Sequence, residues 1–284
     1  HLHTGHSHVS GRAVLQVKAM PVTSSDATDE LLFAVKAGVG TVTFNRPAAR
    51  NALTFGMYQR LQEICQDIDS DGPVKVLVLT GSGDRAFAAG TDISQFRAFS
   101  TPDDAIAYEQ RIDAVLSALE RCPVPTIAAL AGACTGGGAA IAAACDLRIA
   151  TNDFKFGFPI ARTLGNCLSA ANLARLSALL GAGRVREVIF TSRLTGAQEA
   201  LALGLVSELA NDRNDLMSRA EVLAVQLMEQ APLTLQATKE ALRRLGGSDQ
   251  VDDQDLIVMC YTSDDFREGL EAFLGKRKPN WTGR

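Results

Sequence analysis

Three consecutive glycines, Gly136 to Gly138, are the residues whose type and spacing first suggest chemistry. They follow an apolar run, 126–130, and precede the small-residue run 139–144. Alanine is the best helix former, so this second run predicts a buried helix that begins at the glycines. The first amides of a helix have no partner within it, and such amides can stabilise a developing oxyanion. On the glycines alone, close packing that leaves no room for side chains is the simpler interpretation.

The histidines exclude several kinds of catalysis. All four lie among the first eight residues, at positions 1, 3, 6 and 8. A Ser-His-Asp triad, a histidine-ligated metal and a histidine general base are therefore excluded from the body of the chain, and we expect no metal site. The polar segment 1–19 lacks the apolar core of a signal peptide, so we expect a tag or a disordered leader there.

Composition and charge indicate a globular protein with a sizeable core. The chain has 284 residues, of which 46% are hydrophobic and 21% charged. Its net charge of −4 argues against a nucleic-acid partner. No run of about 18 apolar residues is unbroken, so no membrane span is predicted. The six cysteines include no Cys-x-x-Cys pair, which favours buried, reduced thiols and a cytoplasmic location.

The order of the predicted elements indicates the fold class. Strands and helices alternate up to about residue 158, and nearly everything from about residue 168 is helical. This alternation predicts an α/β fold around a mostly parallel sheet. The expected strands are 31–36, 41–44, 74–80, 126–130, 146–150 and 154–158, the expected helices are 55–68, 101–120, 139–144, 168–180, 184–191, 197–203, 213–229, 232–245 and 252–275, and 87–92 is expected to be a loop that leads into a short helical piece.

Several motifs occur in a characteristic order between about residues 31 and 284. They include Asn45-Arg46-Pro47-x-x-x-Asn51-Ala52-Leu53, Ala89-Gly90-x-Asp92, Gly132-x-x-x-Gly136-Gly137-Gly138, Thr195-Gly196 and Phe273-x-x-Lys276. Together they resemble the crotonase family, the enoyl-CoA hydratase/isomerase superfamily. The resemblance implies a crotonase-like spiral of β-β-α units over 20–212. It also implies a C-terminal helical region over 213–284 that forms a homotrimer, or a dimer of trimers.

The resemblance also implies an acyl-CoA site. The backbone N–H groups of Thr91 and Gly137 would hold the thioester oxygen while enolate charge builds on it. The coenzyme A thioester is then the substrate, and no covalently bound cofactor is implied. Arg50 and Lys276 could instead be solvated charges, and Asp92 a helix cap. The implied substrate-binding and CoA-binding residues are Ala49, Arg50, Ala52, Ala89, Gly90, Asp92, Ile93 and Gly136, with Phe273 and Lys276 reaching CoA across a subunit boundary.

Two positions depart from the family pattern. Hydratases of the family carry two glutamates that activate and position water, and the corresponding residues here are Ala140 and Ile160. Adding water to an unsaturated thioester needs an acid and a base near the α and β carbons, which alkyl side chains cannot supply. Hydratase activity is therefore in doubt. Isomerase activity is in doubt for the same reason, because isomerases of the family commonly keep the second glutamate.

Several residues could substitute for the two missing glutamates, and the sequence does not decide between them. The segment 160–167 offers Arg162, Thr163, Asn166 and Cys167 but no carboxylate. Arg162 could bind a substrate carboxylate, or it could be an ordinary surface arginine. Tyr108, Glu109 and Asp113 lie on the long helix after Thr91, and helical phase cannot be fixed from the sequence. Cys134 and Cys167 would be nucleophiles only with lowered pKa values, and inert thiols are the simpler interpretation.

Three functions are compatible with these residues. The first is an acyl-CoA enzyme of the enoyl-CoA hydratase/isomerase family, a lyase or isomerase in fatty-acid or related metabolism. The second is a decarboxylase, thioesterase or carbon–carbon lyase on the same scaffold. The third is a non-catalytic acyl-CoA-binding protein that kept the fold and lost the acids.

Overall fold

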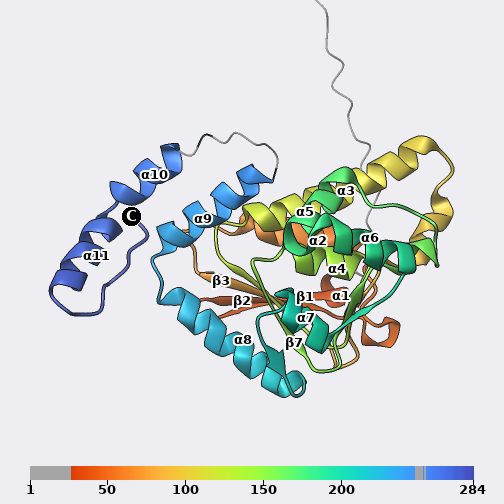
Figure 1. Cartoon of the computed structure of the whole chain (residues 1–284), viewed down its shortest axis with the longest axis horizontal. Coiled ribbons are helices and arrows are strands. Elements are labelled where there is room, and N and C mark those ends of the chain that lie inside the picture. Colours follow the sequence, from red (N-terminus) through yellow and green to blue (C-terminus); the bar gives the residue numbers. More distant parts are fainter. Residues whose placement is uncertain (1–26, 247–251, 253) are drawn as a thin grey trace, which may run out of the picture.

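The computed structural model describes residues 27–246, 252 and 254–284 (Figure 1). The leader expected at 1–19 and the first residues of the predicted core lie outside these residues. The described chain forms two sheets covered by helices, with the helical C-terminal part at one side (Figure 1). This arrangement confirms the predicted α/β class.

The larger sheet has six strands in the order β1-β2-β3-β5-β7-β10. The hairpin β1–β2 is antiparallel, and each of the other neighbouring pairs is parallel. The mostly parallel sheet expected from the alternation of elements is therefore present. Its strands are β1 (Leu31–Lys36), β2 (Val39–Phe44), β3 (Val76–Gly81), β5 (Thr126–Leu130), β7 (Leu147–Thr151) and β10 (Leu209–Ala210).

Both faces of the central strands β3 and β5 are buried, which explains their continuous apolar sequences. In β3, Val76 and Val78 belong to the cluster that includes Leu216 and Ala220 of α8 (Arg213–Met228). Leu77 and Leu79 of β3 belong to the main core on the other face. The sheet thus separates α8 from the helices that surround the candidate site.

The smaller sheet has the order β4-β6-β8-β9 and positions that site. Its strands are β4 (Ala86–Ala89), β6 (Ala133–Thr135), β8 (Lys155–Gly157) and β9 (Thr195–Gly196). In the parallel part, Ala89 lies opposite Thr135, and Thr135 lies opposite Gly157. The carboxyl ends of β4, β6 and β8 therefore meet at one edge. The prediction of a loop at 87–92 was wrong for its first residues, because pairing with β6 makes them a strand.

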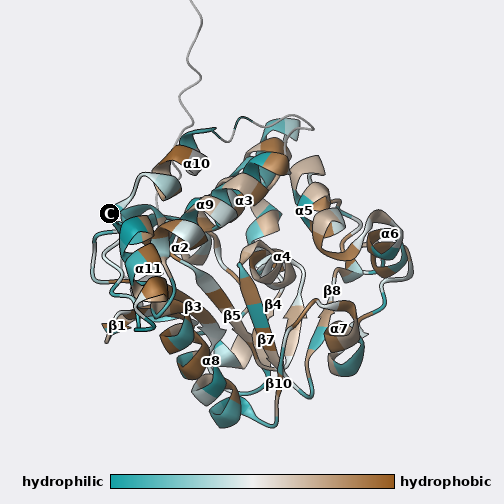
Figure 2. Cartoon of the chain, turned by 60° about the vertical axis from the view of Figure 1, so that its left-hand side comes forward, coloured by the Kyte–Doolittle hydropathy of each residue, from teal (hydrophilic) through white to brown (hydrophobic). Residues whose placement is uncertain are grey.

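The glycine-led helix is α4 (Gly137–Ala144), which lies between α3, α5 and the smaller sheet (Figure 2). A Cβ atom at Gly138 would lie 2.2 Å from the carbonyl oxygen of Ala88. Close packing therefore does explain one of the three glycines. The other helices are α1 (Ala27–Glu30), α2 (Phe55–Asp67), α3 (Pro102–Arg121), α5 (Ala170–Leu180), α6 (Ala182–Thr191), α7 (Ala197–Leu203), α9 (Pro232–Leu245), α10 (Gln254–Tyr261) and α11 (Asp264–Leu274), and the short 3-10 helices are Pro47–Ala49, Ile93–Ala98 and Pro159–Ala161.

One helix predicted over 252–275 is in fact two, α10 and α11. The hydroxyl oxygen of Ser263 accepts a hydrogen bond from the N–H of Phe266 at 3.0 Å, and this cap begins α11. Figure 1 shows both helices beyond α9, at the side of the molecule away from α6 and α7. Among the described residues, no helix has the length and apolar character needed to span a bilayer.

Candidate functional site

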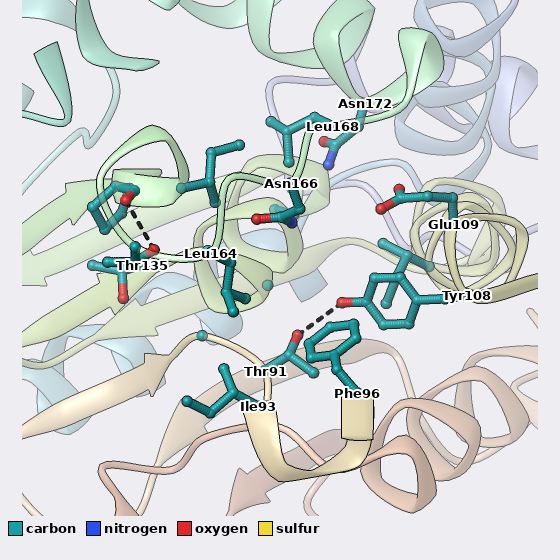
Figure 3. Close-up of a pocket in the computed structure, with 18 of the residues that line it drawn as sticks. Thr91, Ile93, Phe96, Tyr108, Glu109, Thr135, Leu164, Asn166, Leu168 and Asn172 are labelled. Carbon is teal, nitrogen blue, oxygen red and sulfur yellow. Dashed lines mark hydrogen bonds between the residues drawn. The ribbon is translucent and has the colours of Figure 1, made fainter. Parts of the chain in front are cut away.

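A cavity of about 400 Å³ lies where β4, β6 and β8 end (Figure 3). Helix α3, the start of α4 and the segment before α5 close its sides. Its walls are mainly apolar, with a few polar groups. It is lined by Tyr58, Ala89, Gly90, Thr91, Ile93, Phe96, Tyr108, Glu109, Ile112, Thr135, Gly136, Gly137, Ala140, Pro159, Ile160, Thr163, Leu164, Asn166, Leu168 and Asn172.

Two free amides lie at this edge of the smaller sheet. The N–H of Gly90 donates to the oxygen of Thr135 at 2.9 Å, and the N–H of Gly136 donates to the oxygen of Gly157 at 3.0 Å. The next amides along the chain, those of Thr91 and Gly137, donate to no acceptor among the described residues. Both residues line the cavity, so both amides are available to a ligand.

Gly137 packs tightly against the residues around Thr91. A Cβ atom built on Gly137 would lie 1.9 Å from Oη of Tyr58 and 3.1 Å from Oγ1 of Thr91. The preceding residue, Gly136, has a φ of +56°, a left-handed conformation that favours glycine. The left-handed backbone conformation therefore explains Gly136, and close packing explains Gly137 as it does Gly138.

The hydroxyl groups of Tyr58, Thr91 and Tyr108 form a hydrogen-bonded chain at the cavity. Oγ1 of Thr91 lies 2.7 Å from Oη of Tyr58 and 3.0 Å from Oη of Tyr108. Burial raises the pKa of both tyrosines, so both hydroxyls are protonated at neutral pH. The ring of Tyr108 packs against Phe55 and Phe96. No signal in the sequence indicated Tyr58, because it lies in an ordinary amphipathic helix and reaches Thr91 only in the folded chain.

Ala140 and Ile160 both line the cavity. Ala140 is buried in the first turns of α4, and Ile160 is half-buried in the 3-10 helix that follows β8. The two positions to which the resemblance assigns the hydratase glutamates are therefore alkyl parts of the cavity wall, and their equivalence to those glutamates stays a prediction. The segment after them contributes Thr163, whose hydroxyl donates to the oxygen of Pro159 at 3.0 Å, and Asn166.

Arg162 and Cys167 belong to the same segment but do not line the cavity. Both are exposed. Cys134 is fully buried, and burial raises the pKa of its thiol well above the usual range. Neither cysteine therefore has the setting of a catalytic nucleophile.

The helical phase of α3 brings a carboxyl group to the cavity. Glu109 lines it, and burial, with repulsion from Asp113, raises the pKa of Glu109 above its ordinary value. Asp113 does not line the cavity, and its carboxyl accepts a hydrogen bond from Ser169 at 2.7 Å. Asn172, which is 2% exposed, forms another part of the wall. Sequence reasoning left Glu109 as one of three alternatives and missed Asn172.

The loop 49–52 lies beside the loop that carries Thr91. The N–H of Ala89 donates to the oxygen of Arg50 at 3.0 Å, and the N–H of Leu53 donates to the oxygen of Gly90 at 2.9 Å. The buried side chain of Asn51 fixes this contact, because its amide donates to the oxygen of Ala86 at 2.8 Å. Ala49, Arg50 and Ala52 do not line the cavity, and the side chain of Arg50 is exposed.

Asp92 caps the 3-10 helix that follows Thr91. Its carboxylate accepts hydrogen bonds from the N–H and hydroxyl of Ser94 at 3.1 and 2.7 Å, and from Arg46 at 3.2 Å. The hydrogen bonds from Ser94, followed by the charge of Arg46, lower the pKa of Asp92. Asp92 thus has the structural role that was one of its two interpretations. Its neighbour Ile93 is 61% exposed and forms part of the cavity wall.

Phe273 and Lys276 lie apart from the cavity. Phe273 is on α11 with its side chain 83% exposed, and Lys276 follows the end of that helix. Within one chain the structure does not bring them to the site, and their cross-subunit role stays a prediction.

Comparison with known proteins identifies the family of this chain. The family model for enoyl-CoA hydratase/isomerase matches residues 34–284. The short-chain-enoyl-CoA hydratase of Clostridium acetobutylicum is 33% identical over 245 residues, which are 84% of this chain and 92% of that protein. The crotonyl-CoA hydratase of Syntrophomonas wolfei is 29% identical over 265 residues, which are 91% of this chain and 100% of that protein.

Solved structures show the same likeness. The crystal structure of an enoyl-CoA hydratase/carnithine racemase from Magnetospirillum magneticum superposes with a TM-score of 0.83 at 32% identity, over 90% of this chain and 97% of that one. Sequence and fold therefore agree, and the resemblance inferred from the motifs is confirmed. This chain belongs to the enoyl-CoA hydratase/isomerase family, the crotonase superfamily.

Proposed function

We propose that this chain binds an acyl-CoA thioester with the carbonyl oxygen between the N–H groups of Thr91 and Gly137, and stabilises the enolate that forms at the α-carbon. The observation that carries this proposal is the pair of acceptor-free amides at neighbouring strand ends beside one cavity. A donor set in advance at a developing oxyanion contributes about 3–4 kcal/mol to catalysis. We assign the reaction to fatty-acid or related acyl-CoA metabolism.

The cavity walls favour α-carbon chemistry over the addition of water. Ala140 and Ile160 supply neither an acid nor a base. An enolate, in contrast, needs an oxyanion site and one group that removes a proton or a carboxylate. Of the second group of candidates, this observation supports a decarboxylase or carbon–carbon lyase, which form an enolate, whereas a thioesterase adds water at the carbonyl carbon and forms none. The exposed side chain of Arg162 gives no support to a dicarboxyl substrate in particular.

The CoA moiety is proposed to lie along the loop 49–52, where the exposed Arg50 would pair with a phosphate. Phe273 and Lys276 of a second subunit would complete this side, which requires a homotrimer or a dimer of trimers. We also keep the cytoplasm as the proposed compartment, on the ground that each cysteine of the described residues is a free thiol.

Binding of acetoacetyl-CoA tests the oxyanion site directly, because the enolate of this thioester absorbs in the near ultraviolet. We expect the bound ligand to ionise at a pH at least one unit below that of the free ligand. Free CoA serves as the control and should bind without this absorbance. A bound thioester whose ionisation is unchanged would contradict the proposal.

A panel of thioesters then separates the candidate reactions. Hydration removes the absorbance of crotonyl-CoA, decarboxylation releases carbon dioxide from malonyl-CoA, and a thioesterase releases a free thiol. We expect little or no hydration of crotonyl-CoA. If every thioester binds tightly and none reacts, the chain is a non-catalytic acyl-CoA-binding protein.

A further inference from the structure

Glu109 is a half-buried carboxyl group without a partner. It lines the cavity from α3, and no described residue forms a hydrogen bond or an ion pair with it. Asp113, one turn later on the same helix, has Ser169 at 2.7 Å and Arg175 at 3.8 Å. A carboxylate that loses part of its hydration and gains no partner destabilises the folded protein. A contribution to the stability of the fold therefore does not account for the presence of Glu109, whereas it does account for that of Asp113.

Tyr108, the residue before Glu109, attaches this turn of α3 to the loop that carries Thr91. Oη of Tyr108 lies 3.0 Å from Oγ1 of Thr91, the residue that carries one of the two free amides. Figure 3 shows the carboxyl of Glu109 pointing from α3 into the cavity, toward the side chains of Asn166 and Asn172. A thioester bound at the amides would thus extend its acyl chain into the space that Glu109 faces.

Asn172 gives a second, independent indication of a polar ligand. It is 2% exposed and lies in the cavity wall, yet its Oδ1 atom has no hydrogen-bond partner among the described residues. Buried amide groups are nearly always hydrogen-bonded in folded proteins. An unpartnered amide oxygen in the same cavity wall as an unpartnered carboxyl group indicates that a ligand with polar atoms completes this wall.

We propose that Glu109 is the group that moves the proton at the α-carbon, in place of the two glutamates absent at positions 140 and 160; this inference rests on the proposed function. The carboxylate of Glu109 takes the α-proton, and the C–H electron pair becomes the carbon–carbon double bond of the enolate. The negative charge passes to the thioester oxygen between the amides of Thr91 and Gly137. The carboxylic acid of Glu109 then returns its proton to the α-carbon, and no other reactant is needed.

The charged and titratable groups around Glu109 suit this role. Tyr58 reaches the cavity from α2, Tyr108 and Asp113 flank Glu109 on α3, and Arg175 of α5 is engaged by Asp113 and Glu120. Both tyrosines are protonated and Arg175 is paired with Asp113 and Glu120, while burial, followed by the charge of Asp113, raises the pKa of Glu109. A raised pKa makes the carboxylate a stronger base than an ordinary glutamate.

Exchange of the α-protons of butyryl-CoA in deuterium oxide tests the proposal, because this saturated thioester can only lose and regain that proton. We compare the full chain with Glu109→Gln, Glu109→Asp and the control Asp103→Asn, which removes one exposed charge from the same helix. The exchange rate is followed by mass spectrometry over a range of pH, and the affinity for butyryl-CoA by calorimetry.

We expect Glu109→Gln to slow exchange at least 100-fold while the dissociation constant changes less than threefold. The rise of the exchange rate with pH should disappear in this variant, and Glu109→Asp should retain part of the rate. Asp103→Asn should behave as the unaltered chain does. Equal exchange rates in Glu109→Gln and Asp103→Asn would overturn the inference, as would binding of butyryl-CoA without any exchange, and in both cases the oxyanion site would stand. A chain that binds no thioester would overturn the proposed function as well.

Discussion

The site has no room for a methyl group at Gly137. In Gly137→Ala the new Cβ would lie 1.9 Å from Oη of Tyr58, so either that tyrosine or the start of α4 must move. We expect the displaced amide to lose about 3–4 kcal/mol of enolate stabilisation, a fall of about 100-fold to 1000-fold in turnover. The absorbance of bound acetoacetyl-CoA enolate measures this loss.

The matched control for this change is Gly183→Ala. A Cβ at Gly183 in α6 would meet nothing within 4 Å, so this variant should keep full activity and gain up to about 1 kcal/mol of helix stability. Normal enolate binding by a folded Gly137→Ala protein would contradict the assignment of its amide to the oxyanion site.

Glu109 should make the stability of the protein depend on pH. Its pKa is raised in the folded state above its ordinary value of 4.5, so the protonated form favours folding. The stabilisation is complete below about pH 4.5 and is lost as the pH rises through the folded-state pKa. At pH 7 we therefore expect Glu109→Gln to melt higher than the unaltered chain. The difference should stay below about 2–4 °C, because half of the carboxyl group is solvated.

Thermal melts between pH 4 and pH 8 check this expectation. The difference in Tm between the two proteins should shrink to zero as the pH falls below 4.5. A difference that stays constant with pH would show that Glu109 is not held in an unfavourable setting.

The sequence predicted some site residues and not others, for physical reasons. The amides of Thr91 and Gly137 belong to the backbone, and the order of the motifs around them identifies the loops in which they lie. Glu109 was one of three acids or hydroxyls on a helix of known extent, but its direction depends on how α3 packs. Asn172 left no trace in the sequence, because a buried asparagine without a partner resembles an ordinary helix residue until its surroundings are known.

At the scale of elements, one partly buried ion pair attaches α9 to the larger sheet. Nζ of Lys239 lies 2.8 Å from a carboxylate oxygen of Asp146 and 3.1 Å from the carbonyl oxygen of Val124, and its side chain is 11% exposed. The same carboxylate accepts from the N–H of Thr126 at 2.8 Å. Asp146 is thus a structural residue that connects β5, the end of α4 and α9.

Lys239→Met should therefore leave a partly buried carboxylate, that of Asp146, without its cation. We expect a loss of about 1–3 kcal/mol of unfolding free energy, measured by urea denaturation. Lys278→Met is the control, because Lys278 is exposed and lies 3.6 Å from Glu229, so its loss should cost less than about 1 kcal/mol. Equal effects of the two changes would show that α9 is held by its apolar contacts alone.

Element prediction failed where structure depends on distant partners. The strands β4 and β6 are short and rich in small residues, without the alternation that identifies a strand. They are strands because they pair with each other and with β8. The division between α10 and α11 was different, because the cap at Ser263 is a local signal that could have been recognised.

At the scale of the whole molecule, the C-terminal helices present an unusual amount of exposed apolar surface. Tyr261, Leu270, Phe273 and Leu274 are each at least half exposed. Large exposed apolar patches usually mark an interface, and closed symmetric assemblies are the common outcome. The fold class and this helical region were both expected from the sequence, whereas the assembly itself is still a prediction.

We expect the protein to be a trimer or a dimer of trimers at micromolar concentration. Leu270→Ser combined with Phe273→Ser should give a smaller species by light scattering and should weaken CoA binding at least tenfold. Phe190→Ser on α6 is the control, because Phe190 is equally exposed but lies far along the chain from the predicted interface. An unaltered chain that is monomeric would contradict the role of Phe273 and Lys276.

The two hydrogen bonds that join neighbouring strands next to the free amides, from Gly90 to Thr135 and from Gly136 to Gly157, have an evolutionary consequence. Each bond fixes the residue directly before a donor, so the backbone sets the position of the donor, provided that position 137 stays glycine. Replacements at position 91 or in the surrounding wall can accumulate while the anion site persists. A single-residue insertion or deletion between these anchors and the donors would displace the N–H group. Descendants of this chain with new reactions should therefore vary in composition around the cavity but keep the same loop lengths there.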